Sequence, residues 1–237
     1  MKIVKPSYQI IMDCSGEEML KKIERIARTC YKSEDKITKD SAFTFIKGLL
    51  DVGHESIVEH CLVTVRFTTE RITSQCMTRH RLSSFAQEST RWCNYSKGKF
   101  GNEISVIDIA GSIENDNKMN VALQKGTLKS TDINNILVEW KKAIEDSEKH
   151  YMKMLELGAS TDVARSVLPM CLKTEINMTA NLREWRAFFK LRCEQYAHGG
   201  IRELTLPLLK DFHNRIPVVF DDLYDNFIKE GKTTWSK

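Results

Sequence analysis

The stretch of residues 79–91 constrains this chain more than any other part of its sequence. It begins with Arg79-His80-Arg81, seven residues then separate Arg81 from Ser89, and Arg91 follows two positions later. Guanidinium groups hold phosphate through paired hydrogen bonds and also stack on planar rings. Cationic, hydroxyl and amide side chains this close in sequence predict a site for a phosphorylated, planar and polar ligand. A solvated basic surface is the alternative, because most charge runs are solvated.

The composition indicates a globular protein and gives no sign of a nucleic-acid partner. The chain has 237 residues, of which 41% are hydrophobic and 29% are charged, which is enough for a sizeable core. The formal net charge of +4 is too small to indicate a nucleic-acid partner, and it does not oppose an anionic substrate. The seven cysteines are scattered and form no C-x-x-C pair, so we expect neither a disulfide framework nor a metal site.

The N-terminal sequence and the hydropathy indicate where the protein works. Residues 1–6 contain no apolar signal core, and no apolar run is long enough to span a bilayer. We therefore expect a protein with no membrane partner that acts in the cytoplasm, or in a host's cytoplasm.

Apolar periodicity predicts the secondary structure of the first half of the chain. Ser15 and Glu18 form a capping box for a first helix, and Ser56 with Glu59 forms a second one at a helix N-terminus able to bind an anion. The expected elements are a strand over 3–12, a helix over 16–31, a helix around 42–50 that Gly53 ends, a strand over 61–70, a short helix over 71–80 and a loop over 83–91.

The second half begins with a polar, glycine-containing segment. Residues 97–130 predict a variable surface insertion, poorly ordered in parts, with a strand near 104–109. The elements expected after it are a helix over 131–157, a turn over 162–169, a strand over 172–180, a helix over 182–192 that Asn181 caps, and a helical region over 196–228 broken near Pro217. Because helices and strands do not alternate regularly, we expect an α+β fold in a single domain, 1–237. No Rossmann or P-loop glycine motif occurs.

The stretch 79–91 resembles in full the signature of the flavin-dependent thymidylate synthases, Arg-His-Arg followed by seven residues and Ser. Three further stretches match that family in order and rough spacing, so that the resemblance covers about residues 1–215. These stretches are Gly53-His54-Glu55, Ala164-Arg165 to Leu168-Pro169, and Asn181-Leu182-Arg183 leading to Leu191-Arg192.

The resemblance implies a fold, an assembly and a reaction. The fold is a compact thymidylate-synthase-complementing type with mixed helices and a mainly antiparallel sheet, assembled as a homotetramer whose chains share active sites. The reaction is the methylation of dUMP to dTMP. Methylenetetrahydrofolate supplies the carbon, FAD carries the hydride and NADPH reduces the flavin.

The resemblance also implies the site residues. Arg192 is the catalytic residue, and its role must be electrostatic because a guanidinium cannot act as a general base at ordinary pH. Arg91 and Arg165 match the family's positions for the dUMP phosphate. The implied flavin contacts are His54, Ser56, Arg79, His80, Arg81, Gln87, Asn181, Leu182 and Arg183. The implied substrate contacts are Gln75, Arg79, Gln87, Glu88, Ser89, Thr90, Arg91, Arg165 and Arg192.

The sequence departs from the family's pattern at a few positions. Some members carry Glu where Gln87 stands, and glutamine is common where Cys76 stands. Ala187 occupies a position of Asn or His, and His198-Gly199-Gly200 replaces a usual Gln-x-Glu. These departures put individual contacts in question rather than the reaction.

Two alternatives stay open from the sequence. Cys171 follows Leu168-Pro169-Met170, which faintly resembles the cysteine-nucleophile thymidylate synthases that need no flavin, although a small buried hydrophobe is the simpler interpretation. A non-catalytic nucleotide- or RNA-binding protein is the other alternative. It would use the arginines with Trp92, Trp185 and Phe85 as a basic, aromatic surface, against which the mild net charge argues.

Overall fold

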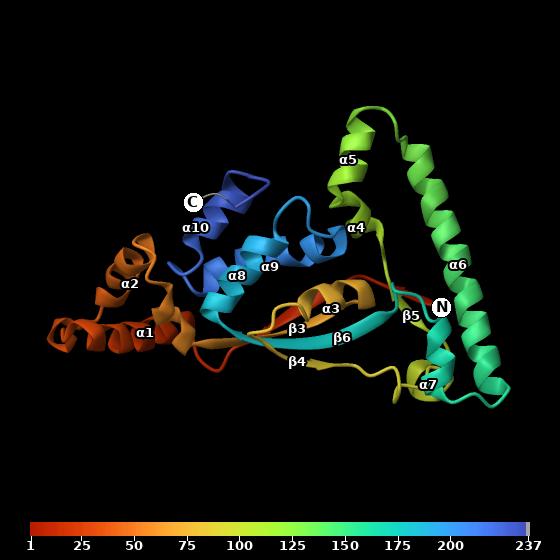
Figure 1. Ribbon diagram of the computed structural model, residues 1–237, viewed down its shortest axis with the longest axis horizontal. Helices are drawn as coiled ribbons and strands as arrows, with labels where there is room; N and C mark the ends of the chain where they lie inside the picture. Colours follow the sequence, from red (N-terminus) through yellow and green to blue (C-terminus); the bar gives the residue numbers. More distant parts are fainter. Residues whose placement is uncertain (236–237) are drawn as a thin grey trace.

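A computed structural model describes residues 1–235 of the protein, with a four-stranded antiparallel sheet at its centre (Figure 1). The strand order is β2-β3-β6-β4, and β6 pairs with β3 along its whole length, from Asn181 opposite Leu62 to Lys173 opposite Glu70. Two parallel strands, β1 and β5, form a separate small ladder. The strands are β1 (Lys2–Val4), β2 (Ser7–Ile11), β3 (Leu62–Glu70), β4 (Ser84–Gln87), β5 (Ser105–Ile107) and β6 (Lys173–Asn181). The expected α+β class with a mainly antiparallel sheet is confirmed.

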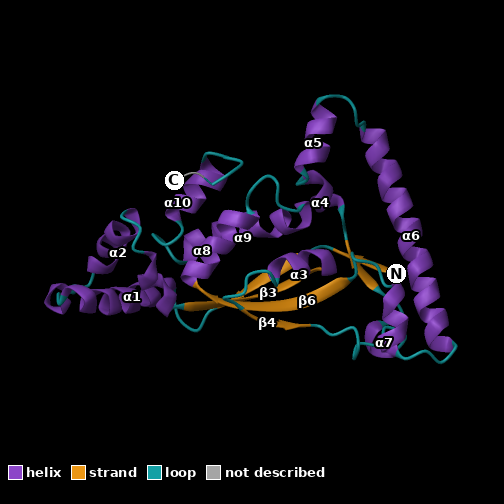
Figure 2. Ribbon diagram, in the orientation of Figure 1, coloured by secondary structure: helices purple, strands orange, loops and turns teal. Residues whose placement is uncertain are grey.

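Helices cover one face of the sheet (Figure 2). Side chains alternate across a strand, and in β6 this buries Thr174, Ile176, Met178 and Ala180 under the helices, while their neighbours stay half-exposed. The core on this side is aromatic, and the Trp185 indole N–H donates to the Val63 carbonyl at 3.0 Å. The helices on this face are α3 (Arg71–Met77), α8 (Leu182–Arg192), α9 (Gly199–Arg215) and α10 (Asp221–Tyr224), followed by the π-helical turn η5 (Asp225–Lys229).

The N-terminal helices lie at one end of the sheet (Figure 1). They are α1 (Gly16–Tyr31) and α2 (Ser41–Asp51), followed by the 3₁₀ turn η2 (Glu55–His60). The capping box of Ser15 with Glu18 is confirmed. The one expected for Ser56 with Glu59 is wrong, because Ser56 lies inside the 3₁₀ turn and His54 precedes it without a side-chain cap.

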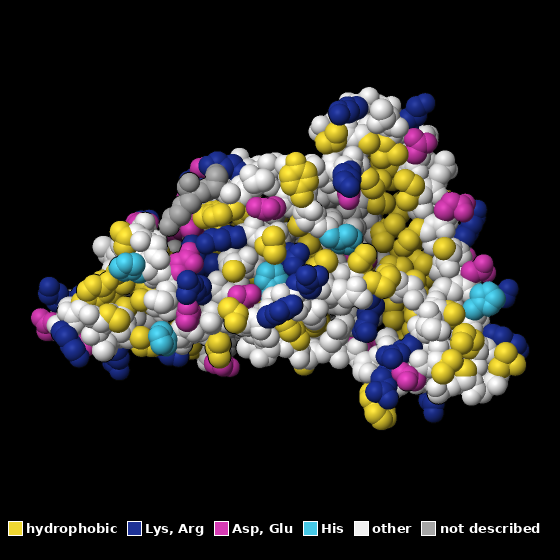
Figure 3. Space-filling view, viewed as in Figure 1, with side chains coloured by type: hydrophobic (Ala, Val, Ile, Leu, Met, Phe, Trp, Pro, Cys, Tyr) yellow, Lys and Arg dark blue, Asp and Glu magenta, His cyan; other side chains and the backbone are white. Residues whose placement is uncertain are grey.

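An arm of helices rises at the other end of the sheet (Figure 1). An apolar strip follows the side of this arm that faces the sheet (Figure 3), with a cavity of about 370 Å³ lined in part by Ile109, Ile113, Met119 and Trp140. None of the helices within residues 1–235 is long and apolar enough to cross a membrane. The helices of this end are α4 (Ala110–Glu114), α5 (Asn117–Gln124), α6 (Ser130–Glu156) and α7 (Thr161–Ala164).

Three expectations about local structure need correction. Segment 97–130 is not wholly a surface insertion, because Ile104, Val106 and Ile107 are buried and β5 pairs with β1; only its polar and glycine-rich parts form exposed turns. The strand expected over 3–12 is two strands in different sheets, separated at Pro6, which lacks the N–H that a continuous ladder needs. Part of the loop expected over 83–91 is β4, which pairs with β6.

The start of α1 packs closely on the end of α9, and this contact predicts the effect of one substitution. A Cβ at Gly16 would collide with the carbonyl oxygen of Arg215, which is backbone and cannot swing aside. We expect Gly16→Ala to cost about 1–3 kcal/mol through overpacking, and to lower the Tm by several degrees in a thermal melt.

Gly48→Ala is the matched control. Gly48 lies within α2, and a Cβ there meets no atom within 4 Å. Replacing glycine inside a helix by alanine gains roughly 0.5–1 kcal/mol, so this variant should melt slightly above the parent protein. A Gly16→Ala protein as stable as Gly48→Ala would contradict the close approach.

Candidate functional site

His80 lies at the centre of a chain of three side chains between α3 and α8. Its Nε2 accepts a hydrogen bond from Arg192 Nε at 3.1 Å, and its Nδ1 lies 3.1 Å from Glu184 Oε1. The ring packs edge-on against Phe188, with centroids 4.9 Å apart. Arg192 Nη2 also donates to the Cys76 carbonyl at 2.8 Å. The end of α3 and the whole of α8 are thereby joined through polar contacts.

These contacts fix the charge and the tautomer of His80. Burial lowers the pKa of His80 to about 4, with the neighbouring Arg192 adding to the shift, so the ring is neutral at pH 7. A guanidinium only donates, so Nε2 must carry the lone pair and Nδ1 the proton, which is donated to Glu184. Burial likewise lowers the pKa of Arg192 and raises that of Glu184. Arg192 is therefore a partly dehydrated cation held in a set orientation.

Arg91 and Arg165 form a second group beyond the end of β4. Asp162 joins them, because its Oδ1 lies 2.7 Å from Arg165 Nη2 and 3.4 Å from Arg91 Nε. Arg165 Nη1 donates to Thr90 Oγ1 at 3.3 Å, and the backbone N–H of Arg91 donates to Ser89 Oγ at 3.4 Å. The short helix α7, which carries Asp162, supplies this shared carboxylate. Two guanidiniums and two hydroxyls thus lie together in an arrangement suited to a phosphate.

Gln87 and Glu88 lie between these two groups. Gln87 Nε2 donates to Ser74 Oγ at 2.8 Å and to Thr174 Oγ1 at 3.2 Å. Glu88 accepts from Lys173 Nζ and from the Tyr95 hydroxyl, each at 3.2 Å. Both side chains line a cavity of about 560 Å³, to which Arg66, Lys99 and Asn177 also contribute.

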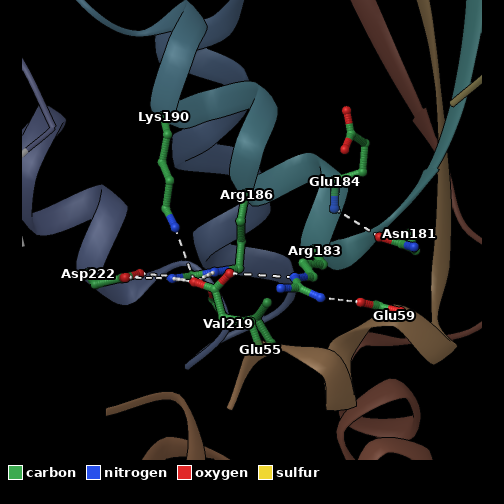
Figure 4. A network of polar contacts seen from close by, with 9 residues as sticks. All are labelled: Glu55, Glu59, Asn181, Arg183, Glu184, Arg186, Lys190, Val219 and Asp222. Atoms are coloured by element: carbon green, nitrogen blue, oxygen red, sulfur yellow. Dashed lines mark hydrogen bonds and ion pairs between the residues drawn. The ribbon is translucent and has the colours of Figure 1, made fainter. Parts of the chain in front are cut away.

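A third group surrounds the N-terminus of α8 (Figure 4). Asn181 caps this helix, because its Oδ1 accepts from the Glu184 N–H at 2.8 Å. Arg183 is exposed and paired with Glu59, and the exposed His54 lies 3.2 Å from the Tyr31 hydroxyl through Nδ1. Ser56 is exposed nearby, within η2. The Leu182 side chain is fully buried, so any ligand contact by this residue falls to its backbone.

A buried ionic network fixes η2 against α8 (Figure 4). Only 3% of Arg186 is exposed, and its guanidinium donates to Glu55 at 3.1 Å, to Asp222 at 2.6 Å and to the Val219 carbonyl. Burial alone would raise the pKa of Glu55, but Arg186 and Lys190 outweigh it and lower the value. The network sets the position of His54 and Ser56 relative to Arg183.

Arg79, Arg81 and Gln75 are exposed around the end of α3. Within residues 1–235 neither Arg79 nor Arg81 pairs with a carboxylate, so both guanidiniums are available to an anionic ligand. In the same part of the chain, no three His, Cys, Asp or Glu residues come together in a way that could hold a metal ion.

The predicted site residues do not all meet in one chain. The Arg91 and Arg165 group lies by α7, beside the arm, whereas Arg192 and His80 lie near α3 and α9 on the helical face (Figure 1). Within residues 1–235 no hydrogen bond or ion pair links the two groups. Sequence reasoning missed Glu184, Asp162 and the burial of Arg186, and in sequence all three have the appearance of ordinary helix-surface charges.

The structure also bears on the departures and the alternatives. Cys76 contributes its carbonyl to Arg192, and the space beside Gly200 is filled by Glu70, since a Cβ there would lie 2.6 Å from Glu70 Oε1. Burial raises the pKa of Cys171 to about 11, which keeps its thiol protonated and argues against a thiolate nucleophile. Trp185 is fully buried in the core, so it cannot join a surface that binds RNA.

Comparison with known proteins gives one consistent family. The sequence model described as "Thymidylate synthase complementing protein" matches residues 12–218. A protein of Pyrococcus abyssi named "Flavin-dependent thymidylate synthase" is 30% identical over 187 residues, 78% of this chain and 68% of the relative. Proteins of the same name are 28% identical in Thermosipho melanesiensis, over 93% of this chain and 91% of the relative, and in Mycolicibacterium gilvum, over 95% and 87%.

The lowered pKa of His80 predicts a pH-dependent stability. Unfolded histidine titrates near 6.5, so between pH 6.5 and about 4 the unfolded state binds a proton that the folded state does not. Lowering the pH through that range should therefore lower the free energy of unfolding. At pH 5 the loss relative to pH 7 is about 2 kcal/mol. His80→Gln is the control, since an amide can accept from Arg192 and donate to Glu184 without titrating. Urea midpoints that drop equally in both proteins from pH 7 to pH 5 would refute the assignment.

Proposed function

The chain belongs to the flavin-dependent thymidylate synthase family, and on that premise we propose that it makes dTMP by reductive methylation of dUMP. Methylenetetrahydrofolate supplies the carbon, and NADPH reduces the flavin, which is FAD. One observation carries the proposal for this chain: the signature histidine His80 is buried and hydrogen-bonded to Arg192, while Arg79 and Arg81 on either side of it stay exposed.

Arg91 and Arg165 bind the dUMP phosphate in this proposal. Their guanidiniums already share the Asp162 carboxylate, at 3.4 and 2.7 Å, so they are held close together before the ligand arrives. A phosphate dianion carries more charge than a carboxylate and can accept from both guanidiniums at once. The hydroxyls of Ser89 and Thr90 lie within the same group and add donors.

Arg192 stabilises the uracil as its C5 becomes a nucleophile. The developing negative charge on the ring needs a cation already in place, and such preorganised charges are strongest where water is excluded. Arg192 fits because it is half-buried and anchored through Nε and Nη2. Its role is electrostatic, and no proton is removed by it.

The residues around α3 and α8 suit a flavin dinucleotide. Bound FAD would supply the hydride that completes the methyl group. Arg79 and Arg81 would hold its pyrophosphate, because both are exposed guanidiniums without a carboxylate partner in residues 1–235. His54, Ser56, Asn181 and Arg183 offer donors and acceptors for the polar edges of its rings.

We also propose a homotetramer whose active sites are shared between chains. The separation of the Arg91 group from the Arg192 group supports this, since one dUMP must contact both. Exposed apolar side chains lie beside the predicted site residues, among them Leu82 at 78% and Trp92 at 84% exposure, and such residues often mark interfaces. The uncovered face of the sheet is a further surface for a partner chain.

Product analysis tests the reaction. Purified protein should convert dUMP to dTMP with methylenetetrahydrofolate and NADPH, in a manner that requires FAD in a reconstituted apoprotein. Liquid chromatography of the nucleotides measures the yield. Formation of dTMP without flavin, abolished by Cys171→Ser, would instead establish the cysteine mechanism. Oxidation of NADPH without dTMP would leave a flavoprotein with another acceptor.

Subunit complementation tests the shared site. Arg192→Ala should nearly abolish turnover, and Arg91→Ala should mainly weaken dUMP binding, so each homotetramer should be almost inactive at low dUMP. Co-expressed with separate tags and purified through both, the two variants should regain activity, with about a quarter of sites intact for random assortment. The matched control pairs Arg91→Ala with Arg165→Ala, which belong to one group and should not complement. Equal behaviour of the two pairs would contradict a shared site.

A further inference from the structure

We propose that Glu184 is the positioning residue for Arg192, acting through the tautomer of His80 that it enforces. The inference rests on the proposed role of Arg192 at the uracil ring. It adds a residue outside the signature, and it explains why a buried, neutral histidine stands between two exposed arginines.

One face of α8 carries both polar partners of His80, with an aromatic residue between them. Glu184, Phe188 and Arg192 are four residues apart, so they share one side of the helix. His80, from the segment that follows α3, lies across this side: its ring packs on Phe188 at 4.9 Å and contacts Glu184 and Arg192 at 3.1 Å each. The imidazole therefore bridges a side chain from the first turn of α8 and a side chain from its last turn.

Only one tautomer of His80 allows hydrogen bonds to both Glu184 and Arg192. With the proton on Nδ1, His80 donates to Glu184 and accepts from Arg192 Nε. With the proton on Nε2, two N–H donors would face each other across the 3.1 Å contact to Arg192, and Glu184 would face a lone pair. The guanidinium would then have to rotate away from His80. The Glu184 carboxylate disfavours the Nε2–H tautomer, because it accepts a hydrogen bond only when Nδ1 carries the proton.

Burial makes the selection depend on Glu184 rather than on water. His80 is 7% exposed and the Glu184 side chain 11%, so solvent cannot readily replace a missing partner of Nδ1. An acid in the first turn of a helix commonly faces solvent, where it interacts with the helix dipole. Here the Asn181 cap binds the Glu184 backbone N–H at 2.8 Å, and the side chain is turned inward to His80.

Glu184→Leu is the variant that tests the inference, because it removes the acceptor while keeping a side chain of similar size. We expect kcat to fall about 10- to 100-fold, as for a displaced catalytic group, with a smaller change in dUMP affinity. Glu184→Gln should rescue kcat to within a few-fold, since its carbonyl oxygen accepts from Nδ1. Glu139→Leu, which removes an exposed carboxylate from α6, is the control and should behave as the parent protein.

A spectroscopic measurement tests the tautomer without any turnover. Magic-angle-spinning NMR of the full-length protein labelled with ¹⁵N-histidine distinguishes Nδ1–H from Nε2–H rings, and the His80→Gln protein identifies the signal of His80. We expect Nδ1–H in the parent protein and in Glu184→Gln, and a shift toward Nε2–H or a mixture in Glu184→Leu.

The outcomes separate this inference from the proposed function. If the parent protein makes no dTMP but His80 is the Nδ1–H tautomer and responds to Glu184→Leu, the function fails while the coupling to Glu184 stands. If the parent protein makes dTMP but its His80 is the Nε2–H tautomer, the inference is overturned, even where Glu184→Leu does not fold. An unchanged kcat and tautomer in a folded Glu184→Leu protein would overturn it as well.

Discussion

The full-length antiparallel pairing of β3 with β6 is the constraint on which the rest of the structure depends. Because the strands run in opposite directions, the end of β3 at Glu70 lies beside the start of β6, and the end of β6 at Asn181 lies beside the start of β3. Each strand leads directly into a helix, α3 or α8, on the buried face. The two helices thus start from opposite ends of the sheet and come together over its middle, where His80 joins them.

Local signals in the sequence predicted much of this arrangement. The Ser15 capping box and the Asn181 cap mark helix starts because a side-chain oxygen can satisfy free backbone N–H groups only at such positions. The signature of residues 79–91 led to the residues near α3 and β4. What could not be predicted was partnership over long distances: Glu184 is 104 positions from His80, and periodicity reports a buried face but not the group that it meets. The burial of Ile104, Val106 and Ile107 was missed for the same reason, since β5 pairs with β1, which begins at Lys2.

The buried charges around α8 connect separate elements of the structure. Arg186 is buried with two carboxylates and a carbonyl, and such networks repay little of the cost of dehydrating their charges. Arg186 joins η2, α8 and α10 through Glu55 and Asp222, so displacing one of these elements would leave a buried guanidinium with fewer partners. The hydrogen bonds of His80 with Glu184 and Arg192 likewise connect α8 to the segment after α3, but here the group between the two charged side chains is a neutral ring.

Asp162 gives the proposed phosphate site an unusual property. Since its carboxylate already joins Arg91 to Arg165, an incoming ligand does not enter an empty site but competes with an internal anion. A phosphate that binds there exchanges contacts to Asp162 for contacts to the ligand, so the net gain is smaller than at two unpaired guanidiniums. A nucleoside without phosphate gains nothing at this point, whereas a doubly ionised monophosphate gains most. The protein would thus favour doubly ionised phosphate ligands over less charged ones, because each ligand must displace the Asp162 carboxylate.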